Sequence, residues 1–134
     1  MTRPPPRTEQ VAPRESPAYL SKAQEFAAMA KSAIDDMRYS GAGLAAIHTV
    51  ISACDAFTVR RLGLRNKGED HRDVVRVMLN SPTEGLEAVT RQVLSVLDLK
   101  NRVEYGGDGL SAGEAERVVA QADRVLRWVE QHLG

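Results

Sequence analysis

The sequence predicts an all-α protein, an up-and-down four-helix bundle with one additional short helix. Three observations lead to this fold class. From residue 17 onward, apolar residues recur at steps of three and four, which is the spacing of one helix face. No segment shows the sustained alternation of apolar and polar residues that is typical of a half-buried strand, so no strand is predicted. Short connections between the periodic segments favour antiparallel neighbours in a bundle.

The first helix is expected to begin at Ser16, because this capping residue precedes a proline at the first helical position. It should extend to about Tyr39, and the glycine-containing residues 40–43 should break it. The second helix should end near Gly63. The residues expected to face inward are Leu20, Ala23, Ala27, Ala30, Ile34 and Met37 in the first helix, and Leu44, Ile47, Ile51, Cys54 and Phe57 in the second.

A polar loop is expected over residues 63–70, followed by a short third helix from about Asp70. Ser81 and Glu84 have the spacing of a capping box, which predicts the start of the fourth helix there. Glycines after Tyr105 should end that helix. The inward positions are Val74, Val77 and Met78 in the short helix, and Leu86, Val89, Val93, Val96, Leu97 and Val103 in the fourth.

The last helix is expected to start at a second capping-box pattern, formed by Ser111 and Glu114. Five of the six prolines precede residue 18, so residues 1–16 are interpreted as an extended or disordered tail that contains proline and arginine. Residues 17–134 form the predicted bundle. The inward positions of the last helix are Val118, Val119, Ala122, Val125, Leu126, Val129 and Leu133.

Composition excludes several classes of function. The 134 residues carry 18 Lys and Arg against 18 Asp and Glu, so the net charge of zero does not support a protein that wraps nucleic acid. The single cysteine, Cys54, excludes an internal disulfide and a cysteine-built zinc site. Three histidines leave little material for a metal centre, and we expect neither metal nor cofactor. Without a long apolar run or a signal sequence, no membrane association is expected, and the expected compartment is the cytoplasm.

Two local features remain as candidate sites. Residues 60–76 contain six Lys or Arg against three acidic residues, and Arg61 and Arg65 lie where they suit the end of a helix. This basic stretch is either a phosphate-binding patch or a solvated loop. His71 opens the short helix as either a packed, capping residue or a base.

The second feature is the end of the fourth helix, where four polar residues lie within about one and a half turns. They are Lys100, Asn101, Glu104 and Tyr105. A lysine, an amide and a phenol at one helix end would hold a phosphate or a ribose. The alternative is a structural cluster that buries Lys100 and Tyr105 in a satisfied hydrogen-bond network.

These patterns, in this order, resemble the HEPN domain, a small helical bundle of eukaryotic and prokaryotic nucleotide-binding proteins, over about residues 17–133. The features are AAIHTVISACDAFTVRRLG in the second helix, a loop that ends in His71, KNRVEY at the end of the fourth helix, and a glycine loop before the final helix. The small actinobacterial-type branch is the most similar. The resemblance implies a homodimer and a partner protein such as a nucleotidyltransferase-type antitoxin.

Many members of this family are metal-independent ribonucleases of toxin–antitoxin or defence systems. The resemblance implies an arginine that holds the scissile phosphate and a histidine, four to six residues later, for proton transfer. In KNRVEY, Lys100 and Tyr105 occupy those places. Tyrosine, with a pKa of about 10, is a poor base at neutral pH, and lysine lacks the bidentate guanidinium fork. We therefore expect a non-catalytic binding module in which Lys100, Asn101, Arg102, Tyr105 and Arg61 hold a nucleotide or RNA phosphate.

The alternative is a metal-independent ribonuclease that uses Arg65 and His71 as catalytic residues. These two residues have five residues between them, which satisfies the family spacing. They lie, however, in the loop before the short helix rather than at the end of the fourth helix. The chemistry would require charge stabilisation at the phosphate and proton transfer, without a metal.

Overall fold

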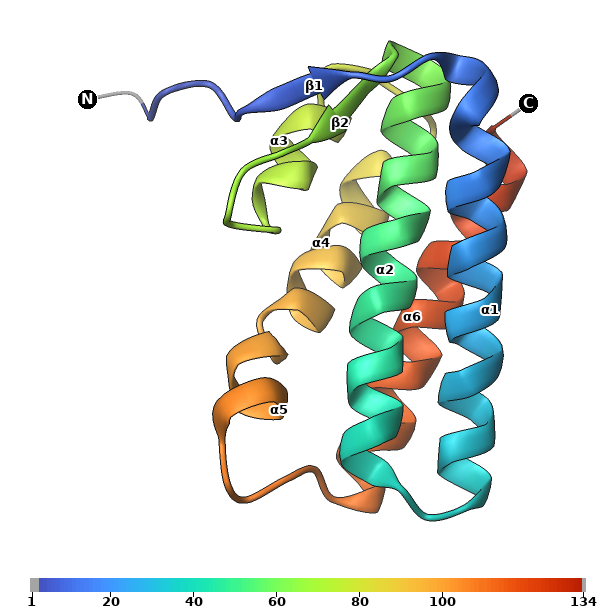
Figure 1. Cartoon of the computed structure of the whole chain (residues 1–134), viewed down its shortest axis with the longest axis vertical. Helices are drawn as coiled ribbons and strands as arrows, with labels where there is room; N and C mark the ends of the chain where they lie inside the picture. Colours follow the sequence, from blue (N-terminus) through green and yellow to red (C-terminus); the bar gives the residue numbers. More distant parts are fainter. Residues whose placement is uncertain (1–2, 134) are drawn as a thin grey trace.

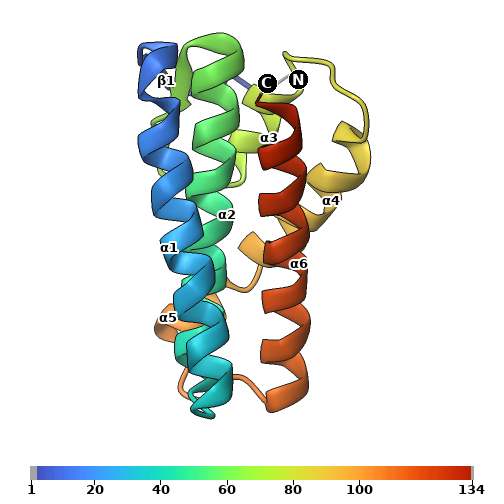
Figure 2. The same ribbon diagram turned by 90° about the vertical axis from the view of Figure 1, so that its right-hand side faces the viewer.

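The computed structural model, which describes residues 3–133, is a helical bundle with a small two-stranded sheet at one end (Figure 1). Helices α1, α2 and α6 lie side by side along the long axis, and α4 packs against α6 (Figure 2). The all-α fold class is confirmed. The elements are β1 (Thr8–Gln10), the 3-10 helix η1 (Pro13–Glu15), α1 (Ser16–Asp35), α2 (Tyr39–Leu62), β2 (Leu64–Asn66), α3 (Asp73–Met78), α4 (Leu86–Leu97), α5 (Lys100–Tyr105) and α6 (Ala112–His132).

Helix α2 forms the centre of the core. It is as long and apolar as a membrane-spanning helix, but 83% of its most apolar window is buried inside the bundle. Alanines at its contact with α1 allow the two helices to approach closely, because they add little volume beyond the backbone. The buried alanines of these two helices are Ala23, Ala27 and Ala30 of α1 and Ala42, Ala45, Ala46, Ala53 and Ala56 of α2.

The prediction of a disordered tail and of no strand was wrong for the N-terminal residues that the structure describes. Strand β1 pairs antiparallel with β2, and Glu9 lies opposite Arg65. β2 in turn occupies part of the predicted polar loop. Each of these strands has only three residues, which is too short for an alternating pattern to be detected in the sequence. The pairing therefore depends on the tertiary contact alone. The hydroxyl of Ser16, predicted to cap α1, donates instead to the carbonyl of Ala56 on α2 (2.7 Å).

The first interhelical turn lies earlier than predicted. α1 ends at Asp35, Met37 adopts a left-handed conformation (φ 59°), and α2 already begins at Tyr39. The glycines expected to break the helix therefore lie inside α2. Gly43 is needed there for close packing, because a Cβ at this position would lie 2.4 Å from Cδ1 of Leu110.

The predicted fourth helix is two helices that meet at an angle (Figure 1). At the end of α4 the backbone tightens, with Leu99 N–H donating to the carbonyl of Val96 (3.1 Å), and α5 starts in a new direction. The predicted capping box at the start of α4 was also wrong. Gly85, in a left-handed conformation (φ 82°), precedes α4, and no side chain caps it. The capping box of Ser111 and Glu114 at the start of α6 is confirmed.

Candidate functional site

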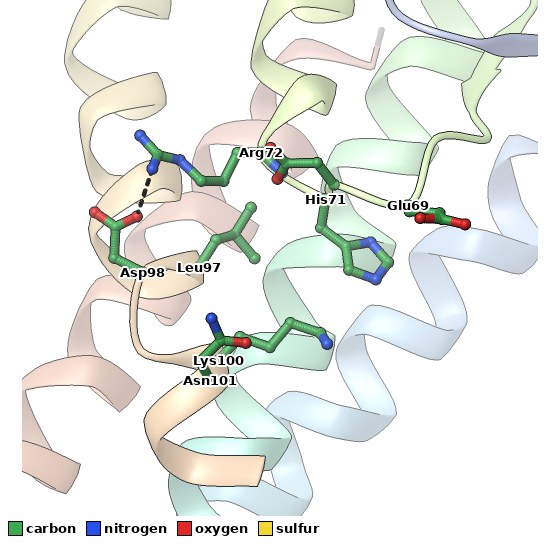
Figure 3. A pocket seen from close by; sticks show the side chains of 8 residues that line it. Glu69, His71, Arg72, Leu97, Asp98, Lys100 and Asn101 are labelled. Carbon is green, nitrogen blue, oxygen red and sulfur yellow. Dashed lines mark hydrogen bonds and ion pairs between the residues drawn. The ribbon is translucent and has the colours of Figure 1, made fainter. Parts of the chain in front are cut away.

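A polar cleft of 470 Å³ lies between the loop that precedes α3 and the start of α5 (Figure 3). One wall is formed by the loop with His71, and the facing wall by α5 with Lys100 (Figure 3). α5 follows the bend after α4 and packs against α2, and its first residues lie across from the loop. The lining residues are Glu69, Asp70, His71, Arg72, Leu97, Asp98, Lys100 and Asn101.

His71 is half-buried at the centre of this cleft. Burial lowers the pKa of its imidazole below the usual range, and the nearby positive charge of Lys100 acts in the same direction. Glu104 and Asp70 act in the opposite direction but do not outweigh them. The ring is therefore neutral at neutral pH, so that one nitrogen donates a hydrogen bond and the other accepts one.

We expect the Lys100→Met variant to raise the pKa of His71 toward its usual value. The substitution removes the positive charge that disfavours the imidazolium, while the buried setting stays the same. An NMR titration of the His71 ring protons measures the shift. Lys31→Met is the matched control, because Lys31 pairs with Asp123 in a different part of the bundle (3.3 Å). An unchanged His71 pKa in Lys100→Met would contradict the facing arrangement.

The α5 wall presents donors to the cleft. Lys100 Nζ forms an ion pair with Oε2 of Glu104, one turn along α5 (2.9 Å), which raises the pKa of Lys100 and lowers that of Glu104. An ammonium group has three N–H donors, so this pair occupies one and leaves two for a ligand. Asn101 adds an exposed amide next to it. The ion pair with Glu104 therefore holds the Lys100 side chain in place and leaves donors of its ammonium group available to a ligand.

Some polar groups of the loop wall already have partners within the protein. Arg72 Nη1 pairs with Oδ1 of Asp98 at the end of α4 (3.2 Å; Figure 3), which ties the loop to the helix. Oδ1 of Asp70 accepts the backbone N–H of Arg72 (2.9 Å). Glu69, at the open side of the cleft, is exposed. The cleft thus sets the Lys100 ammonium on α5 against an acidic loop wall, formed by Glu69 and Asp70, while Arg72 and Asp98 neutralise each other.

Three of the predicted ligand-binding residues do not line this cleft. Arg102 forms a bidentate ion pair with Glu114 and donates to the carbonyl of Gly109 (3.1 Å), so it clips α5 to the start of α6. Tyr105 is 77% exposed, which also rules out the buried structural cluster with Lys100 as a description of this end. Arg61 lies elsewhere, where it donates to Ser81, Thr83 and the carbonyl of His132.

The predicted catalytic pair, Arg65 and His71, does come together, around a cavity of 20 Å³. A space of this size suits about one water molecule and not a phosphate. The Arg65 guanidinium is already paired with Glu9 (3.0 Å) and with the buried carboxylate of Asp55 (3.3 Å). It also stacks over the ring of Tyr19. Arg65 therefore ties β2 to β1 and α2.

Sequence reasoning missed five polar residues at or behind the cleft, of which Glu69 and Asp70 lie on the loop wall. Arg72 and Asp98 pair across its edge, and Asp55 is buried behind His71 in the wall of the small cavity. One signal was present: Asp55 interrupts a run of apolar residues in the second helix. The Arg72–Asp98 pair leaves no sequence signal, because it joins a loop to a helix end 26 positions away.

No protein-family model matches this sequence, and a search of curated proteins found no match. A search of solved structures found the crystal structure of an archaeal HEPN homologue. That chain is 16% identical in sequence and superimposes with a TM-score of 0.70, over 89% of this chain and 98% of that chain. At this identity the likeness establishes the arrangement of the backbone. The chain described here is therefore an all-α protein with a HEPN-like fold.

Proposed function

We propose that this protein is a non-catalytic nucleotide- or RNA-binding module, and that its cleft holds a phosphate on the α5 wall. The observation that carries the proposal is the division of the cleft into two walls. Lys100 and Asn101 offer an ammonium and an amide on one side, and a neutral His71 faces them. Phosphate oxygens accept charge-assisted hydrogen bonds from such donors.

The acidic wall supports a ligand that also has hydroxyl groups. Glu69 and Asp70 carry carboxylate oxygens, which accept hydrogen bonds from a ribose but repel a second phosphate. A nucleotide satisfies both walls at once, with its phosphate at Lys100 and its sugar at the loop. A free inorganic anion would meet only one favourable wall. This is why the cleft supports a nucleotide unit over a simple anion.

Titration calorimetry at low salt with the four ribonucleoside monophosphates tests the proposal, with the corresponding nucleosides as controls for the phosphate. We expect Lys100→Ala to weaken binding by about 10- to 100-fold, since a hydrogen bond to a charged group contributes about 1.5–3 kcal/mol. Lys31→Ala, in the distant ion pair with Asp123, should bind as the unchanged protein does. No binding at low salt by any nucleotide or by a short RNA would refute the proposal, as would unchanged affinity in Lys100→Ala.

The ribonuclease alternative has less support, because the arginine it needs is already paired. Arg65 is bound to Glu9 and Asp55, and its cavity with His71 is too small for a phosphate. Its test is growth of an expression host together with the integrity of total RNA. Growth inhibition and RNA cleavage that His71→Ala relieves would establish catalysis and replace the binding proposal.

A further inference from the structure

A second cleft, of 370 Å³, adjoins the first on the other side of the loop that precedes α3. It is built by the N-terminal segment, residues 3–7, together with Gly68 of the loop and the exposed side of α3. Glu69 lines both clefts, so the two adjoin at this residue. The charged residues of the second cleft are Arg3, Arg7, Glu69, Asp73 and Arg76.

The N-terminal segment is held in place by contacts along its length. The backbone N–H of Lys67 donates to the carbonyl of Arg7 (2.8 Å), which extends the pairing of β1 and β2. Arg76 of α3 donates to the carbonyl of Pro4 (2.8 Å), and Arg3 pairs with Asp73 at the start of α3 (3.0 Å). The cleft therefore has a fixed floor.

The charges of this second cleft differ from those of the first. Three arginines outnumber two carboxylates, and Asp73 is already bound by both Arg3 (3.0 Å) and Arg76 (3.7 Å). Arg7 is exposed and forms no ion pair within residues 3–133. A guanidinium with five N–H donors suits bidentate contact with a phosphate. The favourable position for an added negative charge is therefore at Arg7.

We infer that the N-terminal segment forms a second phosphate subsite, at Arg7, for a nucleic acid strand whose neighbouring unit occupies the first cleft. The inference rests on the proposed function, since it extends the same ligand. A strand of several nucleotides would place one phosphate at Lys100 and another at Arg7, and would pass Glu69 between them. A mononucleotide would reach only the first cleft.

Binding of a fluorescein-labelled single-stranded hexaribonucleotide, measured by anisotropy at several salt concentrations, tests this inference beside calorimetry with a mononucleotide. We expect Arg7→Gln to weaken hexanucleotide binding by about 5- to 10-fold. The slope of the logarithm of the binding constant against the logarithm of the salt concentration should become shallower by about one. Arg7→Glu should weaken hexanucleotide binding further, because the substitution reverses the charge. Mononucleotide affinity should stay the same in both variants, because Arg7 does not line the first cleft.

Arg117→Gln is the matched control, because Arg117 is an exposed arginine of α6 that also forms no ion pair within the described part of the chain. It should leave hexanucleotide binding unchanged. If Arg7→Gln and Arg117→Gln lower hexanucleotide affinity equally, the second subsite is refuted, because the loss then reflects the overall charge of the protein and not a contact at Arg7. Equal affinity of the unchanged protein for hexanucleotide and mononucleotide refutes it as well. Loss of mononucleotide binding in Lys100→Ala together with unchanged Arg7 variants retains the proposed function and removes the subsite.

Discussion

Asp55→Asn should remove a large pH-dependent loss of stability. Burial raises the pKa of the Asp55 carboxyl to about 6, and the carboxylate of Glu9 adds to the effect, although Arg65 and Lys22 lower it. The ordinary value is 3.8. Because the folded state binds this proton more tightly than the unfolded state, the free energy of unfolding falls as pH rises from about 4 to about 6. Above that range the loss is complete, at about 3 kcal/mol.

The measurement is urea unfolding of Asp55→Asn and the unchanged protein at about pH 4 and at neutral pH. Other carboxyl groups titrate in both proteins, so the difference between them isolates Asp55. We expect this difference to shift in favour of the variant by about 2 kcal/mol between these two pH values. A difference that stays constant with pH would show that Asp55 ionises in the folded protein as it does in the unfolded chain.

Phe57→Ala should cause the largest loss of stability, about 3–5 kcal/mol, because it empties a fully buried site. The ring of Phe57 lies 5.0 Å from that of Trp128 on α6, and the guanidinium of Arg61 lies 5.6 Å above it. The side chain thus joins α2 to α6 where the two helices support the end of the bundle. Neither of these neighbours lines the cleft.

Urea unfolding with Leu79→Ala as the control measures this effect. Leu79 is 54% exposed at the end of α3, and its truncation should change the free energy of unfolding by less than about 0.5 kcal/mol. An NMR titration of Phe57→Ala under folding conditions should still show the lowered pKa of His71, since Phe57 is not among the residues around His71. Equal losses in Phe57→Ala and Leu79→Ala would mean that α2 and α6 are not packed through this ring.

The two capping-box patterns show where sequence reasoning succeeds. Ser111 and Glu114 form the predicted reciprocal hydrogen bonds, because each partner lies within one turn of the other, and the ion pair from Arg102 to Glu114 leaves both bonds in place. Ser81 has the same local pattern, but its hydroxyl accepts from Arg61 on α2 instead. A contact from a distant element therefore replaced the local one, and Gly85 became the residue that precedes α4.

The candidate site shows the same division. Lys100 and Asn101 were predicted as ligand-binding residues, and they do line the cleft. Arg61 and Arg65 were expected nearby because they belong to one basic stretch of sequence. Helix α2 and the β1–β2 pairing direct them to other partners, so that Arg61 lies near the end of α6 and Arg65 is bound to Asp55.

The sequence by itself determined the helical bundle, because apolar periodicity decides which face of each helix is buried, and this information is local. It also determined the left-handed end of α2 at Gly63 and the capped start of α6. Only the tertiary structure decided that α5 turns away from α4, and that this turn sets Lys100 opposite His71. The second of these depends on packing between the loop with His71 and the start of α5, which lie about 30 positions apart in the sequence. No periodic signal along the chain reports such a contact.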